Sequence, residues 1–324
     1  MTMARVLDLD PATYTPHAVH RGERTWAETN CYTDVVIELL HGMGHEPLAA
    51  MAFTLGCDWD VDQWTFFKVP PGDVEELYGL ALFELAPWRP LAVHVHDHVA
   101  AGRPVLVELD SFYLPDTAGT AYRLAHVKST VAVNEIDLER QRMTYFHNQS
   151  FHALSGADFV DVFQTDGLVH PRMLPPYIEF VKAVPGSSPL TGPDRVAASL
   201  AQLRRQLDRL PAANPFPAFR AAVARDMDWL LSAEMDDFHA YSFATLRQYG
   251  ACFSLAAAYL RWLTAEGVDG LDAAIAGLDG ISEGAKRLQF QLARSMMRKR
   301  PLKLAPLDAQ ADLWAQTMEA LRSR

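Results

Sequence analysis

The sequence predicts an α+β protein in two parts, and two observations support that prediction. Helical and strand-like patterns alternate up to about residue 185, and the patterns after that point are helical almost to the end. Between the two regions lies a run rich in proline and glycine, from Pro185 to Pro193, which is typical of a linker. With 324 residues the chain is long enough for two domains. We therefore predict an α+β domain over 1–190 and an α-helical bundle domain over 191–324.

Composition limits the class of protein. An apolar content of 49% with 21% charged residues is typical of a folded globular chain. The formal charge of −11 argues against a nucleic-acid partner, which would need a basic face. We find no signal-peptide pattern, and the most apolar helical stretch, Gly250–Leu260, is too short to cross a bilayer. The expectation is a cytoplasmic protein with no membrane partner.

In the first part the pattern predicts both helices and strands. Helices are expected over 31–41, 47–55, 73–80 and 94–101. Strands are expected over 64–69, 105–109, 126–136 and 142–147, the last two joined as a hairpin by a charged turn. In the second part, apolar stripes at helical spacing predict a bundle of about five helices.

Cys31 lies where a polar stretch gives way to the apolar pattern of the first helix, with Thr29 or Asn30 as the expected cap. A helix N-terminus carries partial positive charge and free N–H groups, which favour a thiolate and can hold an oxyanion. The other cysteines, Cys57 and Cys252, complete a sparse set without metal or disulfide spacing. Cys31 is therefore a candidate nucleophile, provided that a histidine reaches it.

The predicted hairpin offers that histidine. With the turn centred near residue 138, His126 falls opposite about Ser150, and Asn148 is its diagonal neighbour on the same face. An imidazole oriented by an amide can take the thiol proton, which gives a Cys-His-Asn arrangement. A slip of one residue would present His147 instead. The structural alternative is that Cys31 is a small buried residue and His126 a strand end.

Three other clusters have simpler interpretations. His94, His96 and His98 are expected on the face of a helix rather than around a metal. An alternating run of aspartates at 58, 60 and 62 lacks the glycine and glutamate of a calcium loop. We thus expect neither a metal site nor a cofactor. Near the C-terminus a basic cluster, comprising Arg294, Arg298, Lys299, Arg300 and Lys303, suits a helix end or a dock for an anionic partner such as an acyl-carrier protein.

Several strings together resemble a bacterial family of unknown function, and the resemblance covers most of the chain. The strings are Asn30-Cys31-Tyr32 with Glu38, residues 64–68, residues 108–117, Tyr122 with residues 126–128, residues 145–148 and residues 241–250. More distantly, the first part is similar to the N-terminal domain of the BtrH-like acyltransferases and to the bacteriocin-processing cysteine peptidases. Both of those groups have a papain-like fold.

The resemblance implies a papain-like cysteine-nucleophile domain in which Cys31 is the nucleophile, His126 the base and Asn148 the orienting residue. The Asp110…Leu114-Pro115 string resembles a segment that lies close to the site in the BtrH-like domain. The substrate site is expected to include Asp110, Asn30, Asp34, Tyr113 and Lys128.

The expected activity is acyl transfer, in which Cys31 takes an acyl or aminoacyl group from a carrier-protein thioester and passes it to a small-molecule amine or hydroxyl. A cysteine peptidase or amidase on the same residues is one alternative, and a non-catalytic module that binds a carrier protein is another. The chain departs from papain-type enzymes because no glutamine lies shortly before Cys31; Glu23 and Glu28 are found there instead. That departure favours a thioester, whose leaving group needs less help than an amide's.

Overall fold

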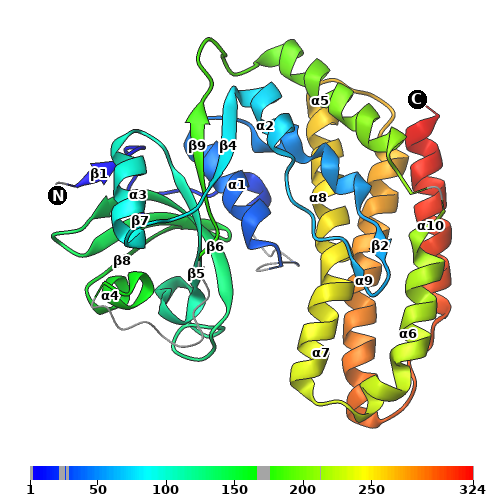
Figure 1. Ribbon diagram of the computed structural model, residues 1–324. Helices are drawn as coiled ribbons and strands as arrows, with labels where there is room; N and C mark the ends of the chain where they lie inside the picture. The colour runs from blue at the N-terminus through cyan, green and yellow to red at the C-terminus, as the bar shows by residue number, and fades with distance from the viewer. Residues whose placement is uncertain (1–2, 22–25, 27–28, 166–175, 212, 324) are drawn as a thin grey trace. The chain divides into compact units, whose positions relative to one another are not determined.

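A computed structural model describes residues 3–21, 26, 29–165, 176–211 and 213–323. The chain divides into two units (Figure 1). The first comprises 1–22, 31–47 and 71–190, and the second comprises 23–30, 48–70 and 191–324. The division therefore differs from the continuous boundary expected at residue 190, because the early segment 48–70 and the described residues 26, 29 and 30 group with the late helices.

The first unit is built on an antiparallel sheet of seven strands within the described residues. The strands run in the order β4-β9-β5-β6-β7-β8, and β1 also pairs with β6. Their bounds are β1 Ala4–Arg5, β4 Leu80–Leu85, β5 Val105–Asp110, β6 Lys128–Asp137, β7 Arg142–His147, β8 Ser150–Ser155 and β9 Ile178–Ala183. Four of these strands, β1, β4, β8 and β9, had not been expected from the pattern.

Helices cover both faces of this sheet. One face packs against α1, Cys31–Gly42, whose Val36, Leu39 and Leu40 surround a small apolar space together with Leu106 of β5. The other face carries Val105, Val107 and Val131 and packs against α3, Leu91–Ala100, and α4, Ala157–Phe163. Strand side chains alternate between the two faces, so each residue of β5 and β6 can be assigned to one of them.

The remaining elements of the first unit are short. They are α2, Pro71–Tyr78, and three 3₁₀ turns at Ala18–His20, Ser111–Tyr113 and Pro115–Thr117, labelled η1, η3 and η4. The helices expected at 31–41, 73–80 and 94–101 are present as α1, α2 and α3, with shifted ends. The expected strands at 105–109, 126–136 and 142–147 correspond to β5, β6 and β7.

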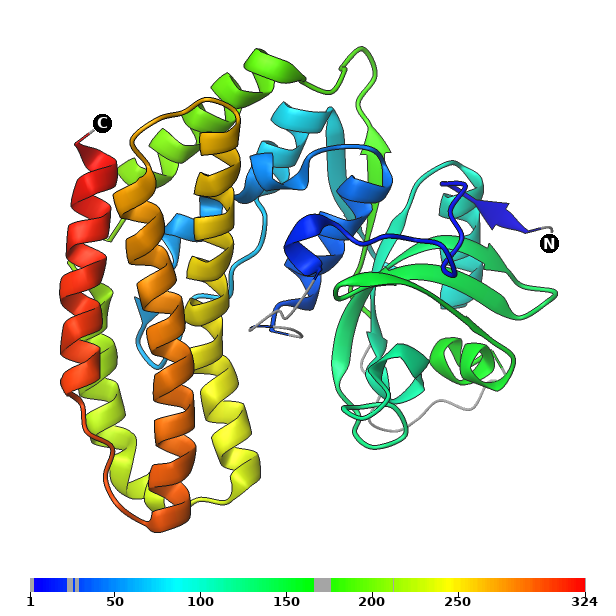
Figure 2. The same cartoon turned by 180° about the vertical axis from the view of Figure 1, so that it is seen from behind.

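The second unit is helical, and its long helices lie side by side (Figures 1 and 2). It contains α5 Gly192–Asp208, α6 Pro215–Ser232, α7 Met235–Ser242, a π-helical turn η5 Phe243–Arg247, α8 Gln248–Ala265, α9 Asp272–Arg298 and α10 Ala305–Arg322. It also contains the 3₁₀ helix η2, Pro47–Gly56, and the two-residue strands β2, Trp59–Asp60, and β3, Gln63–Trp64. The expected strand over 64–69 is thus reduced to its first residue.

The general class predicted from the sequence is confirmed: mixed α and β elements around an antiparallel sheet are followed by a helical region. Among the described residues, no helix is both long enough and apolar enough to span a bilayer.

Candidate functional site

The thiol of Cys31 is placed by α1, which begins at that residue. The run from Val35 to Leu40 is buried against the sheet, and this burial fixes the helix in position. Cys31 itself is only half-buried, unlike Cys57 and Cys252, which are buried. Its sulfur thus lies at the positive end of the helix dipole, on the surface side of the α1–sheet interface.

A backbone N–H of the sheet points at the sulfur. The amide of Thr130, in β6, donates to Sγ of Cys31 with an N···S distance of 3.4 Å. A donor at this position stabilises negative charge on the sulfur. Thr130 also lies only four residues beyond His126 along the chain.

His126 precedes β6 and is paired with a carboxylate. Its Nδ1 lies 2.6 Å from Oδ2 of Asp110, the last residue of β5. The other carboxylate oxygen of Asp110 accepts a hydrogen bond from the backbone N–H of Phe112 at 3.0 Å. The Phe112 ring stacks on the imidazole with the ring centres 4.3 Å apart. Because a carboxylate accepts from Nδ1–H, the ring is held in the tautomer whose Nε2 can take a proton.

Strand register places this pair on the same face of the sheet as the thiol. Asp110 pairs with Lys128 and Glu108 with Thr130, and the N–H of Ser111 donates to Val127, which continues the ladder toward His126. Alternation then puts Glu108, Asp110, Lys128 and His126 on the face of Leu106, which α1 covers.

The expected substrate-site residues divide into two groups. Asp110, Tyr113 and Lys128 lie around His126: the Tyr113 ring centre is 6.2 Å from the imidazole, and Lys128 forms an ion pair with Glu108 at 2.7 Å. Asn30 instead donates to the carbonyl of Phe67, which ties down the segment before Cys31. Asp34 is buried, 3.3 Å from Nε2 of His20.

The hydrogen bond predicted for Asn148 is made by Asp110 instead. Val131 is the strand partner of His147, which is a register about two residues from the expected one, and a bulge lies between Val133 and Glu135. Strand β7 then ends at His147, and Asn148 forms the turn into β8 with a left-handed φ of 49°. The periodicity of a hairpin reveals neither a bulge nor the residue at which a strand turns back.

His147, the alternative to Asn148, belongs to the opposite face of the sheet. It is fully buried and shares a face with Val131. Its Nδ1 lies 2.5 Å from Oδ2 of Asp116, and its Nε2 lies 2.6 Å from the hydroxyl of Ser129. The Tyr145 hydroxyl donates to the other oxygen of Asp116 at 2.5 Å. This network ties the segment after Asp110 to β6 and β7 from behind the thiol face.

A buried carboxylate on the α1 face of the sheet was missed by sequence reasoning. Glu179 of β9 accepts from the hydroxyls of Tyr32 and Tyr177, each at 2.7 Å. Tyr32 directly follows Cys31, and burial together with the Glu179 charge raises its pKa. Glu179 pairs with Leu106, so it lies on the α1 face. The only signal in the sequence is the spacing of two between Tyr177 and Glu179, which identifies a face only once β9 is known to be a strand.

A second buried carboxylate anchors α1 itself. Glu38 accepts from the Tyr14 hydroxyl at 2.5 Å and from the backbone N–H of His17 at 3.1 Å, and it also contacts Nδ1 of His20. Burial is the main factor that raises the pKa of Tyr14, and the hydrogen bond and charge of Glu38 raise it further. Glu38 therefore fastens the middle of the nucleophile helix to the N-terminal segment.

The sequence strings that resemble a bacterial family include several of the residues described above. Comparison of the sequence with family models also identifies a family. Residues 15–183 match the DUF1839 N-terminal domain, and residues 193–323 match the DUF1839 C-terminal domain. The chain belongs to the DUF1839 family. No curated protein sequence matches it.

Family residues of the C-terminal domain hold the segment before Cys31. The Arg247 guanidinium donates to the Thr29 hydroxyl at 3.2 Å. The Trp26 indole donates to Ser282 at 2.7 Å, and its ring lies against Gly250, where a Cβ would come within 2.3 Å of the ring. Arg247 ends the π-helical turn η5, a distortion that often marks functional sites. Glu23 and Glu28, which are found before Cys31 where papain-type enzymes have a glutamine, lie outside the described residues.

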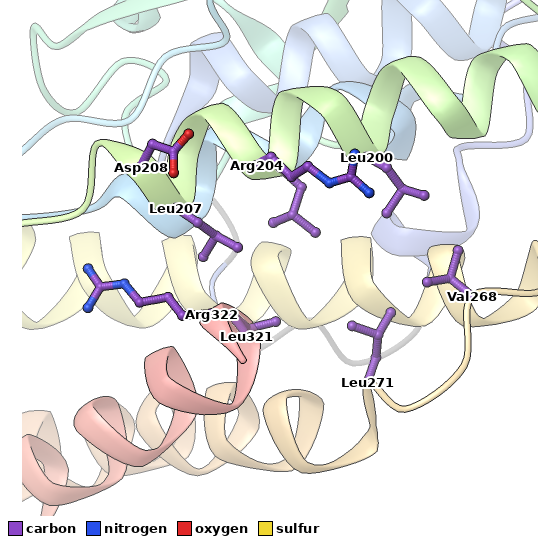
Figure 3. Close-up of a pocket in the computed structure, with 9 residues that line it drawn as sticks. Leu200, Arg204, Leu207, Asp208, Val268, Leu271, Leu321 and Arg322 are labelled. Atoms are coloured by element: carbon purple, nitrogen blue, oxygen red, sulfur yellow. The ribbon is translucent and has the colours of Figure 1, made fainter. Parts of the chain in front are cut away.

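A separate cavity of about 910 Å³ lies among the helices of the second unit (Figure 3). Apolar side chains of α5, α10 and the segment after α8 line it together with three charged residues, Arg204, Asp208 and Arg322. None of the residues around the thiol lines it. It is therefore a feature of the helical unit and takes no part in the site on the sheet.

Proposed function

We propose that this protein is a cysteine-dependent acyltransferase that works through an acyl-Cys31 intermediate. The observation that carries the proposal is the placement of a half-buried thiol at the start of α1 and of a His126–Asp110 pair on the same face of the sheet. The resemblance to BtrH-like domains supports a papain-like arrangement, since a helix-borne cysteine and a strand-borne histidine are its defining parts.

In the first step the thiol proton moves to Nε2 of His126 while the sulfur attacks the thioester carbonyl carbon. The carbon–sulfur bond of the donor breaks, and the leaving thiolate takes the proton from the imidazolium. In the second step an amine or hydroxyl attacks the acyl-Cys31 carbonyl and gives its proton to His126. The Cys31 thiolate then leaves and regains that proton. Asp110 keeps the ring oriented and stabilises its charged form.

The expected substrate is a thioester because the site offers few oxyanion donors. Backbone N–H groups at the start of α1 can bind a developing oxyanion. The sequence provides no glutamine before Cys31 to add a second donor of the papain type. A thiolate is a good leaving group, so acyl transfer needs less of this help than peptide cleavage. We propose a carrier-protein-bound acyl or aminoacyl group as donor and a small molecule as acceptor.

The test is the rate at which an electrophilic thiol probe labels Cys31 as a function of pH. Cys57 and Cys252 are buried, and burial raises the pKa of Cys252. Labelling of Cys31 in preference to these two would therefore show only that Cys31 is more exposed, and not that its thiol is activated. The informative comparison is between the unsubstituted protein and His126→Ala at pH 6. Labelling that is fast at pH 6 and slowed by the substitution supports the proposal. A rate that rises only around pH 8.5 in both proteins, as for an ordinary thiol, overturns it.

Loading experiments then separate the possible activities. Incubation with an acyl-carrier thioester is expected to give a mass increase on Cys31 equal to the acyl group. Hydrolysis of a peptide without any thioester turnover would assign the site to a peptidase instead. Absence of an adduct together with retained binding of the carrier protein would indicate a non-catalytic module.

A further inference from the structure

The exposed face of α9 combines positive charge with apolar side chains. Residues 284–307 include seven Lys or Arg and no Asp or Glu, in a chain whose formal charge is −11. Helical spacing places Phe290, Arg294, Met297 and Arg298 within one stripe. Phe290 is 66% exposed and Met297 77% exposed. In Figure 2 the ribbon of α9 lies between those of α8 and α10.

Most basic side chains of this surface form no ion pair within the described residues. Among the described residues, Arg294, Arg298, Lys299 and Arg300 take part in no ion pair, whereas Arg287, two turns before Arg294, pairs with Glu283 at 3.4 Å. A helix C-terminus accounts for one or two cations through the dipole, but not for a run that continues into the connection to α10. Two large exposed apolar residues within a basic patch are typical of an interaction surface.

We propose that the α9 surface, defined as Phe290, Arg294, Met297, Arg298, Lys299 and Arg300, docks an acidic protein partner through an amphipathic helix. The basic residues would pair with its carboxylates, and Phe290 and Met297 would supply the desolvated centre of the contact. The net negative charge of the whole chain disfavours a nucleic acid, whose phosphates would be repelled outside the patch. This inference rests on the proposed function to the extent that an acyl-carrier protein is the acidic donor.

Binding is measured by fluorescence anisotropy with a labelled holo acyl-carrier protein and the Cys31→Ala form of this chain, so that no acyl transfer intervenes. The charge reversal Arg294→Glu with Arg298→Glu is expected to weaken binding by about tenfold or more. Phe290→Ser is expected to weaken it by a similar factor, because a central aromatic anchor is lost. Raising the salt concentration should weaken binding of the unsubstituted surface.

The matched control is Arg204→Glu on α5 with Arg209→Glu directly after it, which makes the same change of net charge at two other exposed arginines of the helical unit. This control should retain binding. Equal losses in both double variants, or unchanged binding in the α9 variant, would overturn the docking surface. Tighter binding of a single-stranded DNA probe that is lost with the α9 charges would replace the protein partner with a nucleic acid.

A second readout separates this proposal from the acyltransferase proposal. Cys31 is loaded from carrier-bound acyl groups and, separately, from a small acyl-N-acetylcysteamine thioester. The α9 double reversal should slow loading from the carrier alone. If Cys31 accepts an acyl group from neither donor while the binding pattern holds, the activity is wrong and the docking surface stands. Equal loading from the carrier in the presence and absence of the α9 charges would overturn the surface and leave the activity intact.

Discussion

His126 is oriented by a hydrogen bond to the carboxylate of Asp110, a residue earlier in the chain, and not by a residue of the strand that follows it. Asp110 ends β5, and its register partner Lys128 is two residues from His126. The contact therefore depends on the pairing of β5 with β6 and not on the β6–β7 hairpin. At the scale of single residues, this is the largest change that the structure makes to the predicted site.

Replacing Asp110 by asparagine should slow acylation of Cys31 by about 10²-fold or more, because the imidazole loses the carboxylate that fixes its tautomer and stabilises its charge. Stopped acylation reactions analysed by mass spectrometry measure this rate. Asn148→Ala serves as the control and should change the rate by less than about threefold. A larger effect at Asn148 than at Asp110 would restore the predicted Cys-His-Asn arrangement.

Gly250 is the residue on α8 that admits the Trp26 ring. Gly250→Ala places a Cβ within 2.3 Å of that ring and should lower the free energy of unfolding by about 1–3 kcal/mol through overpacking. Urea denaturation measures the change. Gly72→Ala is the matched control because nothing lies within 4 Å of the added Cβ, and it should be neutral or slightly stabilising. Equal stability of the two variants would show that the Trp26 contact is not tight.

At the scale of elements, β6 carries different chemistry on its two faces. The thiol and His126 belong to the α1 face, whereas Ser129, His147 and Asp116 form a buried network on the other. Burial pushes the Asp116 pKa up, but hydrogen bonding and charge from His147 and His152 outweigh it, so the pKa lies below its ordinary value. The ionised carboxylate is thus part of the folded state.

Asp116→Asn should cost about 3–5 kcal/mol of folding free energy at pH 7, because the buried carboxylate that faces His147 and accepts from Tyr145 is lost. A carboxyl group whose folded pKa is depressed stabilises the fold above its ordinary pKa and loses that contribution as the pH falls through the folded value. The difference between the variant and the unsubstituted protein should therefore shrink below about pH 4. Urea unfolding from pH 7 down to pH 3 measures it.

Asp161→Asn is the control for that experiment. Asp161 pairs with Arg123 in a half-exposed ion pair at 3.1 Å, so its removal should cost less than about 1 kcal/mol. A cost for Asp116→Asn that stays constant from pH 7 to pH 3 would contradict an ionised Asp116 in the folded protein.

Elements whose signal is local were predicted well, and those that depend on distant partners were not. The apolar run of α1 and the β-branched run of β5 can each be recognised from the local sequence alone. Strand β9 contains Glu179 and Lys182, which weaken its apolar pattern. Besides the nearby Tyr177, its buried carboxylate accepts a hydrogen bond from Tyr32, about 150 positions earlier. No window of the sequence contains that information.

At the scale of the whole molecule, the two units share the chain in an interleaved way. Residues 48–70 belong to the helical unit, where the Ser199 hydroxyl donates to the carbonyl of Ala49 and the Cys252 thiol donates to that of Thr54. Residues 71–190 then return to the sheet unit. The linker that the sequence marks near residue 190 is therefore only one of several crossings.

A fragment of residues 1–190 should consequently fail to fold as a stable domain. Residues 49–52 and Leu55 are fully buried among the described residues of the helical unit, and the fragment would expose them. Size-exclusion chromatography and far-UV circular dichroism of the fragment, beside the full chain, test this. A monomeric fragment with cooperative unfolding would show that the 48–70 segment is dispensable for the sheet unit.

From the sequence alone it was possible to predict the class of fold and the position of Cys31 at the start of a helix, and to select His126 and Asp110 as candidate site residues, because each depends on a local pattern or a family string. The folded chain was needed to establish which residue pairs with His126, which face His147 occupies and which unit the early segments join. Those outcomes depend on strand register, a bulge and long-range burial. Each of these three features depends on contacts between residues that are far apart in the sequence. The periodicity of one stretch of chain does not encode such contacts.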